Sequence, residues 1–390
     1  TSVERDSRQV KNGSLFLAIK GERVDGHDFI EKCFAQGAVC ALCEKAPENA
    51  TKPCIVVPST LDAVKKIGRA YREKFDIPVI GISGSVGKTS TKEMLYAVLS
   101  QKFKTHKTQG NLNNELGVPL TLLSMPEDTE AAVIEMGISD FGEMTRLSEM
   151  VQPTICVLTI IGECHLENLG DRDGVLKAKT EMFKNARKNA DFILNGDDDK
   201  LSTVKTVNGK KPVFFGLDAK NDFYAKNIKN SGDGKVLATL CFDNNDIDVE
   251  IPAIGTYMVT NALAAAAAGK LLGLTDEEIA NGVASYKTVG SRANVIDTGK
   301  IKIIDDCYNA NPTSVRASLD TLSNLDGRKV AILGDMKELG SEELKLHFDT
   351  GVYAKSKDIG TVITVGELAK ELAKGADGKA FDTIEDAKSE

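Results

Sequence analysis

The stretch "GISGSVGKTSTKEM", from Gly81 to Met94, continues the apolar run "IPVIGI" into a loop that holds three glycines, a lysine and neighbouring hydroxyl residues. This order predicts a buried strand, a glycine-rich loop and a helix that opens at Thr89. Such a loop points consecutive backbone N–H groups at one position, and the positive end of the helix dipole lies beside it. The stretch therefore predicts a phosphate site, with a generic strand–helix turn as the alternative.

The lysine and the hydroxyl after the last glycine have separate expected roles. Lys88 is placed to reach the terminal phosphates of a nucleotide, and Thr89 is placed to offer its hydroxyl to Mg²⁺. The strict phosphate-loop pattern has a glycine five residues before Gly87, where this chain has Ile82. The spacing is therefore unusual, and it narrows the choice of family.

The composition excludes some classes of protein. The 390 residues include 57 acidic and 49 basic side chains, a formal charge of −8. A nucleic-acid binder usually has a basic excess or stripe, so this balance disfavours one. No apolar run approaches the roughly 20 residues that span a bilayer. No export signal is visible, so the eight cysteines are expected to be reduced thiols in a cytoplasm.

The cysteine pair Cys40 and Cys43 has two interpretations. With Cys33 and Cys54 nearby, a C-x-x-C pair is compatible with a zinc site. The surrounding sequence "GAVCALCE" favours a buried strand in which cysteine acts as a small apolar residue.

The pattern of apolar runs predicts an α/β fold of three domains, with boundaries at residues 1–77, 78–290 and 291–390. From Pro78 onward, strand-like and helical segments alternate, which indicates a mainly parallel sheet covered on both faces. Residues 213–254 alternate polar and apolar positions and are expected to form antiparallel strands in the same domain. A helix is predicted over residues 261–273, followed by a capping box that begins at Thr275.

Three further side chains are candidates for the chemistry. Glu135 ends the apolar strand "AAVIEMG", at the edge of a parallel sheet where ligands bind, although a solvated turn glutamate is the alternative. His165 follows the strand "TICVLTIIG" and, taken alone, is more often a structural histidine. Lys179 lies in the helical segment "VLKAKTEMF", where most lysines are solvated.

The motif "GSVGKTSTKEM" resembles the ATP-binding loop of the Mur ligases, cytoplasmic enzymes that build the peptide of the bacterial cell-wall precursor. The segments "DSRQVKNGSLFLAIKGERVDGHDFI", "TQGNLNNELGVPLTLL", "VIEMGIS", "IDDCYNANPTSV" and "ILGDMKELG" extend the resemblance over essentially the whole chain. They are similar to the member that adds D-alanyl-D-alanine to UDP-N-acetylmuramoyl-tripeptide.

The resemblance implies an ATP-dependent amide ligase of three domains that bind, in order, UDP-sugar, ATP and the incoming amine. The central domain is expected to be a parallel-sheet phosphate-loop ATPase, and the last domain to be Rossmann-like and truncated. ATP makes amide formation feasible through an acyl phosphate, which the amine attacks. Positioning and electrostatics supply most of the catalysis in such phosphoryl transfer. The expected partners are these small molecules, with neither nucleic acid nor membrane, and the chain is expected to be a monomer.

The resemblance also assigns roles by position. The implied metal ligands for Mg²⁺ are Thr89, Glu135, His165 and Lys179, the last as a carbamate formed with CO₂. With Lys88, the last three of these form the implied catalytic set. The implied nucleotide contacts are Gly84, Ser85, Gly87, Lys88, Thr89, Ser90, Asn261, Arg292 and Asp306. The implied substrate contacts are Ser7, Arg8, Asp25, Gly26, His27, Asn111, Asn114 and Glu115.

The chain departs from the family pattern at four positions. Val86 and Ile160 each replace a usual asparagine, and Tyr257 and Met258 replace a usual His-Asn pair. The family extends further at both ends, so a complete enzyme is expected to be longer. Two alternatives stay open. One is a sister ligase that adds a single diamino acid, although its "D-N-P-R" type motif does not occur here. The other is a non-catalytic paralogue that binds nucleotide or precursor.

Overall fold

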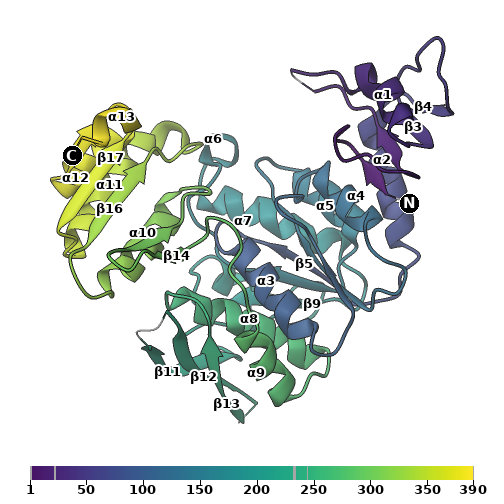
Figure 1. The fold of residues 1–390 in the computed structure, drawn as a ribbon. Helices are drawn as coiled ribbons and strands as arrows, with labels where there is room; N and C mark the ends of the chain where they lie inside the picture. Colours follow the sequence, from purple (N-terminus) through teal and green to yellow (C-terminus); the bar gives the residue numbers. More distant parts are fainter. Residues whose placement is uncertain (1, 22, 232–233, 244, 390) are drawn as a thin grey trace.

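The computed structural model describes residues 2–21, 23–231, 234–243 and 245–389. It consists of three α/β regions, with the N-terminal region and the C-terminal region on opposite sides of a larger central one (Figure 1). Below, these regions are called the N-terminal, central and C-terminal domains.

The N-terminal domain contains a four-stranded parallel sheet in the order β1-β2-β3-β4. Its core includes the side chains of Phe16, Ile30 and Cys43. Cys40 and Cys43 therefore lie on a strand, as predicted, and Cys43 is fully buried. The elements are β1 (Val3–Glu4), β2 (Leu15–Leu17), a 3₁₀ turn (Gly26–Phe29), α1 (Ile30–Ala35), β3 (Cys40–Cys43), β4 (Cys54–Val56) and α2 (Thr60–Arg72).

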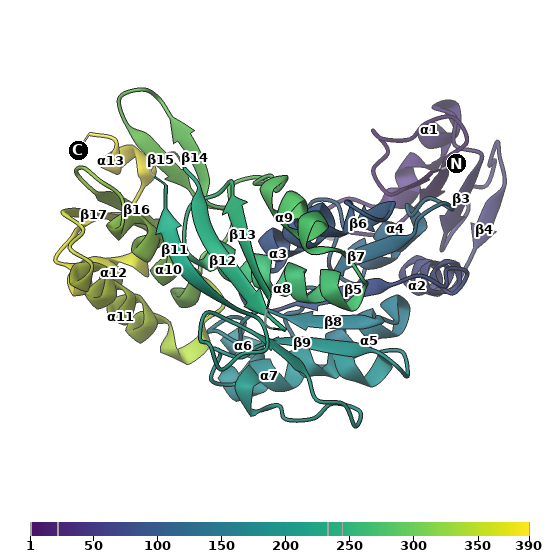
Figure 2. The ribbon, with the colours of Figure 1, turned by 90° about the horizontal axis from the view of Figure 1, so that it is seen from below.

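The central domain contains a six-stranded parallel sheet in the order β10-β9-β8-β5-β7-β6, and several of its strands run side by side in Figure 2. Its strands are β5 (Val79–Ser83), β6 (Thr105–Lys107), β7 (Ala131–Glu135), β8 (Ile155–Leu158), β9 (Asp191–Asn195) and β10 (Val213–Phe215). Its helices are α3 (Lys88–Leu99), α4 (Gly117–Leu123), α5 (Glu143–Val151), α6 (Leu166–Leu169), α7 (Arg172–Thr180), α8 (Tyr257–Leu271) and α9 (Asp276–Ala284), with 3₁₀ turns at Glu181–Asn185 and Leu201–Thr203.

Both faces of this sheet are apolar and packed against helices, because successive apolar side chains along a strand point to opposite faces. Ile80 and Ile82 of β5 belong to the core shared with α3 and α8, whereas Val79 belongs to the core on the opposite face, with α5 and α7. The chain leaves β5 toward β6 on one side and later reaches β8 on the other. The carboxyl ends of β5 and its neighbours are therefore a topological switch point, where ligands bind in such sheets.

A three-stranded antiparallel sheet packs against α8 and α9. It consists of β11 (Tyr224–Asn230), β12 (Val236–Phe242) and β13 (Asn245–Ile251). The prediction of antiparallel strands is confirmed there but is wrong for β10, which pairs parallel with β9. Helix α8 begins at Tyr257, four residues before the predicted start, and the predicted capping box at Thr275 is present.

The C-terminal domain begins with an antiparallel hairpin and continues as a three-stranded parallel sheet in the order β16-β17-β18. The hairpin is formed by β14 (Asn294–Asp297) and β15 (Lys302–Asp305). The following elements are α10 (Pro312–Ser323), β16 (Val330–Gly334), a 3₁₀ turn (Gly340–Glu342), α11 (Glu343–Ser356), β17 (Thr361–Val365), α12 (Ala369–Ala376), β18 (Lys379–Phe381) and α13 (Ile384–Ala387).

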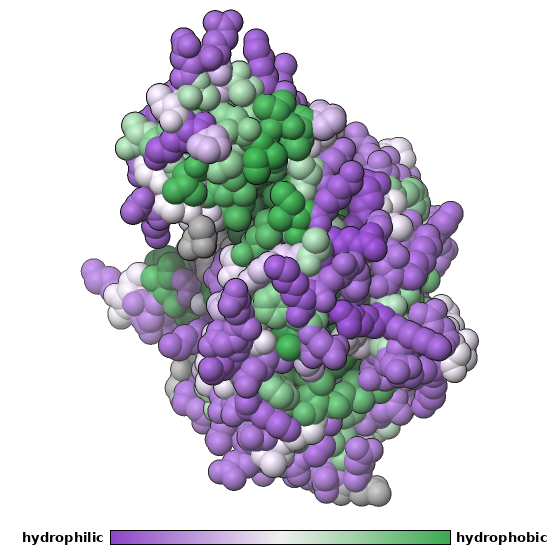
Figure 3. Space-filling model, turned by 90° about the vertical axis from the view of Figure 1, so that its right-hand side faces the viewer, coloured by the Kyte–Doolittle hydropathy of each residue, from purple (hydrophilic) through white to green (hydrophobic). Residues whose placement is uncertain are grey.

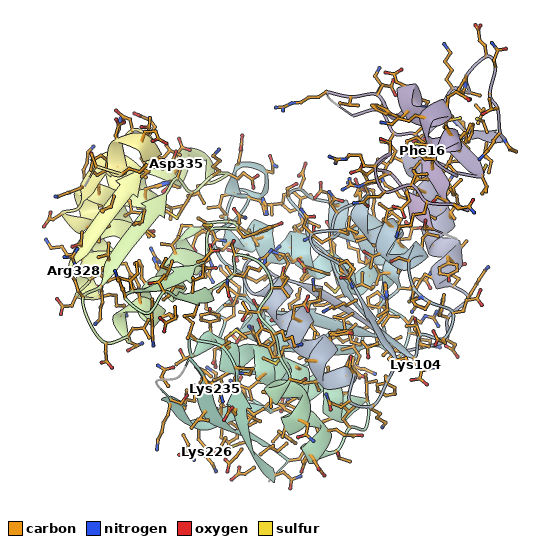
Figure 4. The ribbon with its side chains drawn as sticks, in the orientation of Figure 1. Phe16, Lys104, Lys226, Lys235, Arg328 and Asp335 are labelled. Carbon is orange, nitrogen blue, oxygen red and sulfur yellow. The ribbon has the colours of Figure 1, made fainter. Side chains whose placement is uncertain are left out.

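The surface is mainly polar, with apolar residues gathered in the upper part of Figure 3, where the N-terminal domain lies. Ile55 and Val56 of the edge strand β4 are each more than half exposed. Phe16, labelled in Figure 4, is instead buried in the core of the same domain. Within the described residues, no helix is both long and apolar enough to cross a lipid bilayer.

Candidate active site

The glycine-rich loop joins β5 to α3 at the predicted place. Gly87 adopts a φ of 83° as the residue that caps α3, and Gly84 adopts a φ of 152°. The neighbouring strand β8 supports the loop, because Thr159 donates a hydrogen bond of 2.6 Å to the carbonyl of Val86. The residue that follows β8 therefore fixes the backbone of the loop at Val86.

The second support of the loop is the segment after β8. The backbone N–H of Ser85 donates to the carbonyl of Ile160 at 2.7 Å. The Ser85 hydroxyl accepts from the N–H of Gly162 at 2.9 Å. Val86 and Ile160, two of the departures from the family pattern, thus act here through backbone carbonyls, so their side chains are not needed for these contacts.

We expect Gly84→Ala to destabilise the fold by about 1–3 kcal/mol, because a non-glycine residue is strained in that conformation. In addition, a Cβ atom at Gly84 would lie 1.9 Å from Oγ1 of Thr159. A thermal unfolding curve measures the loss of stability, and a nucleotide-binding assay measures the effect on the loop. Gly209→Ala is the control, since Gly209 also has a positive φ but its Cβ would meet open space. Equal effects of the two substitutions would contradict the role of the clash.

The Lys88 ammonium lies over its own loop. Its Nζ donates to the carbonyl of Gly84 at 2.8 Å and approaches the carbonyl of Ser85 at 3.4 Å. These carbonyls are weak partners compared with a phosphate. The side chain therefore lies against the backbone of the loop, at the start of α3.

Glu135 ends β7 next to the start of α3 and is 1 % exposed. Its carboxylate accepts from Thr89 Oγ1, at 3.0 and 3.2 Å, and from Asn113 Nδ2 at 2.8 Å. The hydroxyl and the carboxylate predicted to serve one metal ion are therefore adjacent. Asn113 lies in the "GNLNNELG" segment, one residue before the predicted contact Asn114.

A buried ion network surrounds Glu135 and was missed from the sequence. Lys92 is 1 % exposed, and its Nζ lies 3.2 Å from Glu93 and 3.6 Å from Glu135. Lys107 forms an ion pair with Glu93 and lies 3.9 Å above the ring of Tyr96. The position of Lys92, one helical turn after Thr89, was the signal that could have placed it near the phosphate loop.

Lys179, on α7, is 1 % exposed, unlike Lys177 two residues earlier, which is exposed. Burial, with a smaller contribution from the nearby ammonium of Lys88, lowers the pKa of Lys179 to about 8. Within the described part of the chain, this amine has no hydrogen-bond or ion-pair partner. Near neutral pH, Lys179 therefore has a larger neutral fraction than an ordinary lysine, and the neutral amine is the form that adds to CO₂.

His165 lies in the loop that opens α6, with a φ of 52°. Burial lowers the pKa of its imidazole, and the ammonium of Lys179 adds to this effect. His165 and Lys179 are thus electrostatic neighbours close to Lys88. The structure brings the predicted phosphate loop, Glu135, His165 and Lys179 to one region.

The predicted nucleotide contacts beyond the loop line one cavity of about 570 Å³, which lies between the central and C-terminal domains. Asn261 accepts from Thr91 at 2.9 Å and donates to the sulfur of Met258 at 3.4 Å. Asp306 accepts from the N–H of Ala293 at 3.0 Å, and burial raises the pKa of its carboxyl group. The cavity residues among the predictions are Ser85, Gly87, Lys88, Ser90, Asn114, Glu115, Glu135, His165, Asn261, Arg292 and Asp306, together with Tyr257.

The predicted substrate contacts of the N-terminal domain lie apart from this cavity. The Arg8 side chain is 85 % exposed and pairs with Asp6. Asp25 caps the 3₁₀ turn that contains Gly26, and it contacts the His27 ring at 2.6 Å. Ser7, between Asp6 and Arg8, does not line the cavity either.

The remaining predicted contacts occupy the loop before α4. Asn111 is exposed and outside the cavity. Asn114 contacts the first residue of α4, because its Oδ1 accepts from the N–H of Gly117 at 2.8 Å. Glu115 pairs with Lys65 of α2 at 3.1 Å and with Arg146 of α5. Asn114 and Glu115 therefore have structural partners in addition to their predicted contact with substrate.

Family models match nearly the whole chain. The matches are Mur ligase family, catalytic domain, at residues 1–74; Mur ligase middle domain, at 82–269; and Mur ligase, glutamate ligase domain, at 291–389. The chain belongs to the Mur ligase family. It is similar to the UDP-N-acetylmuramoyl-tripeptide–D-alanyl-D-alanine ligases of Bacillus subtilis (38 % identical; 96 % of this chain, 82 % of that one) and Escherichia coli (37 %; 95 % and 82 %).

Solved structures agree with the sequence relatives. MurF from Acinetobacter baumannii matches with a TM-score of 0.92 at 34 % identity and covers 99 % of this chain and 85 % of that one. MurF ligase from Thermotoga maritima in complex with ADP matches with a TM-score of 0.88 at 29 % identity, covering 100 % and 90 %. The predicted family, the three-domain α/β architecture and the ligase class are confirmed.

Proposed function

We propose that this chain ligates D-alanyl-D-alanine to UDP-N-acetylmuramoyl-tripeptide at the expense of ATP, acting as a monomer in cytoplasmic peptidoglycan precursor synthesis. The substrates are those in the names of its relatives in Bacillus subtilis and Escherichia coli. The observation that carries the reaction type is the contact of Thr89 with Glu135 beside the phosphate loop. It supports a metal-binding pair beside the position proposed for the γ-phosphate.

The proposed reaction has two steps. A carboxylate oxygen of the tripeptide attacks the γ-phosphorus of ATP, the bond to the β-phosphate oxygen breaks, and ADP and an acyl phosphate result. The dipeptide amine then attacks the acyl carbon, loses a proton, and expels inorganic phosphate. Lys88 and the loop N–H groups stabilise the charge on the transferred phosphoryl group, because they are already oriented toward it.

The residues at the phosphate loop fit Mg²⁺. The Thr89 hydroxyl and the Glu135 carboxylate are hard oxygen donors, the type that this ion prefers. Among the described residues, no group of three His, Cys, Asp or Glu side chains could hold an ion unaided. That finding suits an ion that keeps water and phosphate oxygens as its other ligands. When bound, Mg²⁺ neutralises charge on the β- and γ-phosphates.

A second ion near His165 requires a change in Lys179. An ammonium or a neutral amine offers no oxygen to a hard cation, so the unmodified side chain does not fit. A carbamate would supply two oxygens and a negative charge. The buried and unpaired amine, with its lowered pKa, supports this proposal.

The proposed nucleotide contacts are the loop residues Gly84 to Ser90, with Asn261, Arg292 and Asp306 on the other walls of the cavity. Arg292 lies 4.0 Å from the ring of Tyr308, on the C-terminal wall. The UDP-sugar is proposed to bind the N-terminal domain at Ser7, Arg8 and residues 25–27. Its peptide would then extend past Asn111, Asn114 and Glu115 toward the phosphate loop.

A substrate panel scored by ADP release tests the proposed function. UDP-N-acetylmuramoyl-dipeptide and UDP-N-acetylmuramoyl-tripeptides with different third residues are each offered with D-alanyl-D-alanine, with a single diamino acid, or with no amine. We expect ADP release only when ATP, a tripeptide and the dipeptide are all present. ADP release with UDP-N-acetylmuramoyl-dipeptide and a diamino acid would instead identify a sister ligase. Binding of nucleotide or precursor without any ADP release would identify a non-catalytic paralogue.

A further inference from the structure

A loop of the C-terminal domain contacts the segment of the central domain that carries His165. The loop, residues 335–340, follows β16 and reaches α6; Asp335, at its start, is labelled in Figure 4. The N–H of Glu167 faces the carbonyl of Glu338 at 3.4 Å. Gly340 packs so closely that an added Cβ would lie 3.2 Å from Cα of Glu167.

The main side-chain contact at this place joins His165 to Glu338. Nδ1 of the imidazole is buried and lies within ion-pair distance of the Glu338 carboxylate. The contact does not meet the geometric criteria of a hydrogen bond, so in this arrangement it is an ion-pair contact. Glu338 adopts a φ of 62°, a conformation that is uncommon for a non-glycine residue.

The other ring nitrogen of His165 is free for a ligand. Within the described residues, Nε2 has neither a hydrogen-bond partner nor an ion pair. The side chain is 25 % exposed and lines the large cavity. The ring therefore presents one nitrogen to a carboxylate of another domain and leaves the second for the cavity.

This division is the usual arrangement of a metal-binding histidine, in which a carboxylate on one nitrogen fixes the tautomer and orientation of the other. We propose that Glu338 is a positioning residue that holds His165 with Nε2 toward the metal and phosphate site. A residue of the C-terminal domain then holds a proposed metal ligand of the central domain in position, without itself binding the metal. The inference rests on the proposed role of His165 as a metal ligand.

A consequence follows for domain position. Glu338 can orient His165 only while the C-terminal domain remains where it is in this structure. Metal affinity and the contact between the domains are then coupled, and the coupling is reciprocal. Binding of the ion strengthens the contact by the same factor by which the contact strengthens binding.

The matched control is a second side-chain contact between the central and C-terminal domains. Thr313, on α10, donates to the Glu163 carboxylate at 2.8 Å, two residues before His165. Thr313→Val removes this hydrogen bond between the domains but leaves the imidazole and its partner in place. It therefore separates loss of contact between domains from loss of orientation of the ring.

The test measures Mn²⁺ affinity by electron paramagnetic resonance, in the full chain with a non-hydrolysable ATP analogue. We expect Glu338→Ala to weaken the affinity for one ion about 10–100-fold. Glu338→Gln, which keeps an acceptor oxygen but no charge, should fall between Glu338→Ala and the unmodified protein. Thr313→Val should change the affinity less than about threefold. Glu338 is more than half exposed, so these variants should fold normally, which circular dichroism verifies.

His165→Ala distinguishes failure of this inference from failure of the proposed metal role. If His165→Ala weakens Mn²⁺ binding and Glu338→Ala does not, Glu338 is not a positioning residue and the inference is overturned alone. If His165→Ala leaves Mn²⁺ binding unchanged, the metal role of His165 and the inference fall together. Equal losses in Glu338→Ala and Thr313→Val would show a general effect of the contact between domains, and would also overturn it.

Discussion

Replacement of Lys88 by alanine is expected to lower kcat by about 10²–10³-fold, equivalent to about 2.7–4 kcal/mol of transition-state stabilisation. The ammonium is the cation attached to the loop itself, and its hydrogen-bond partners among the described residues are two carbonyls of that loop. A phosphoryl group in transfer gains more from this charge than a ground-state nucleotide does. The KM for ATP should therefore rise less than kcat falls.

The measurement is ADP release with all substrates saturating, together with a thermal unfolding curve. Lys88 contributes little to the core, so the unfolding temperature should stay close to that of the unmodified protein. Lys177→Ala is the matched control, since Lys177 is an exposed lysine on nearby α7 that contacts the Phe141 ring. Near-normal turnover in Lys88→Ala would remove Lys88 from the reaction.

Lys179→Ala is expected to reduce the rate at least about a thousandfold, since a metal contributes several kcal/mol of charge stabilisation. The carbamate proposal adds a result that simple loss of a lysine does not give. Formate or acetate should partly restore the activity of the alanine variant, because a small carboxylate can fill the vacated space and supply the missing oxygens.

The unmodified protein offers an independent test of the carbamate. Only the neutral amine adds to CO₂, and burial lowers the pKa of Lys179 to about 8. At a fixed concentration of dissolved CO₂, the fraction modified should therefore increase as the pH is raised through about 8. Mass spectrometry after chemical trapping measures that fraction. If carboxylates fail to rescue Lys179→Ala and CO₂ depletion has no effect, Lys179 is a structural lysine.

The strand–loop–helix geometry around Gly84 and Gly87 was predictable, because each of its parts follows from the neighbouring sequence. An apolar strand must precede the loop, Gly84 and Gly87 permit positive φ, and the helix begins where the apolar periodicity changes. The position of Glu135 at the end of its strand was also predictable, because parallel strands bring their carboxyl ends to one edge.

Contacts made across the fold were not predictable in this way. A lysine on a helix, such as Lys92, is usually solvated. Only the packing of β7 against α3 shows that Lys92 is buried beside Glu135. Glu338 reaches His165 from a different domain through an unusual backbone conformation. The parallel pairing of β10 was missed because three residues carry too little periodicity to distinguish it from the antiparallel strands that follow.

The most direct test of the central claim follows an oxygen atom. The terminal carboxylate of the UDP-N-acetylmuramoyl-tripeptide is labelled with ¹⁸O, and the substrate is incubated with the protein, ATP and D-alanyl-D-alanine. An acyl phosphate transfers one carboxylate oxygen to the departing phosphate. We therefore predict one ¹⁸O atom in inorganic phosphate for each dipeptide joined, and none in ADP. Unlabelled phosphate, or ADP release without formation of the amide, would contradict the assignment of this chain as an acyl-phosphate ligase.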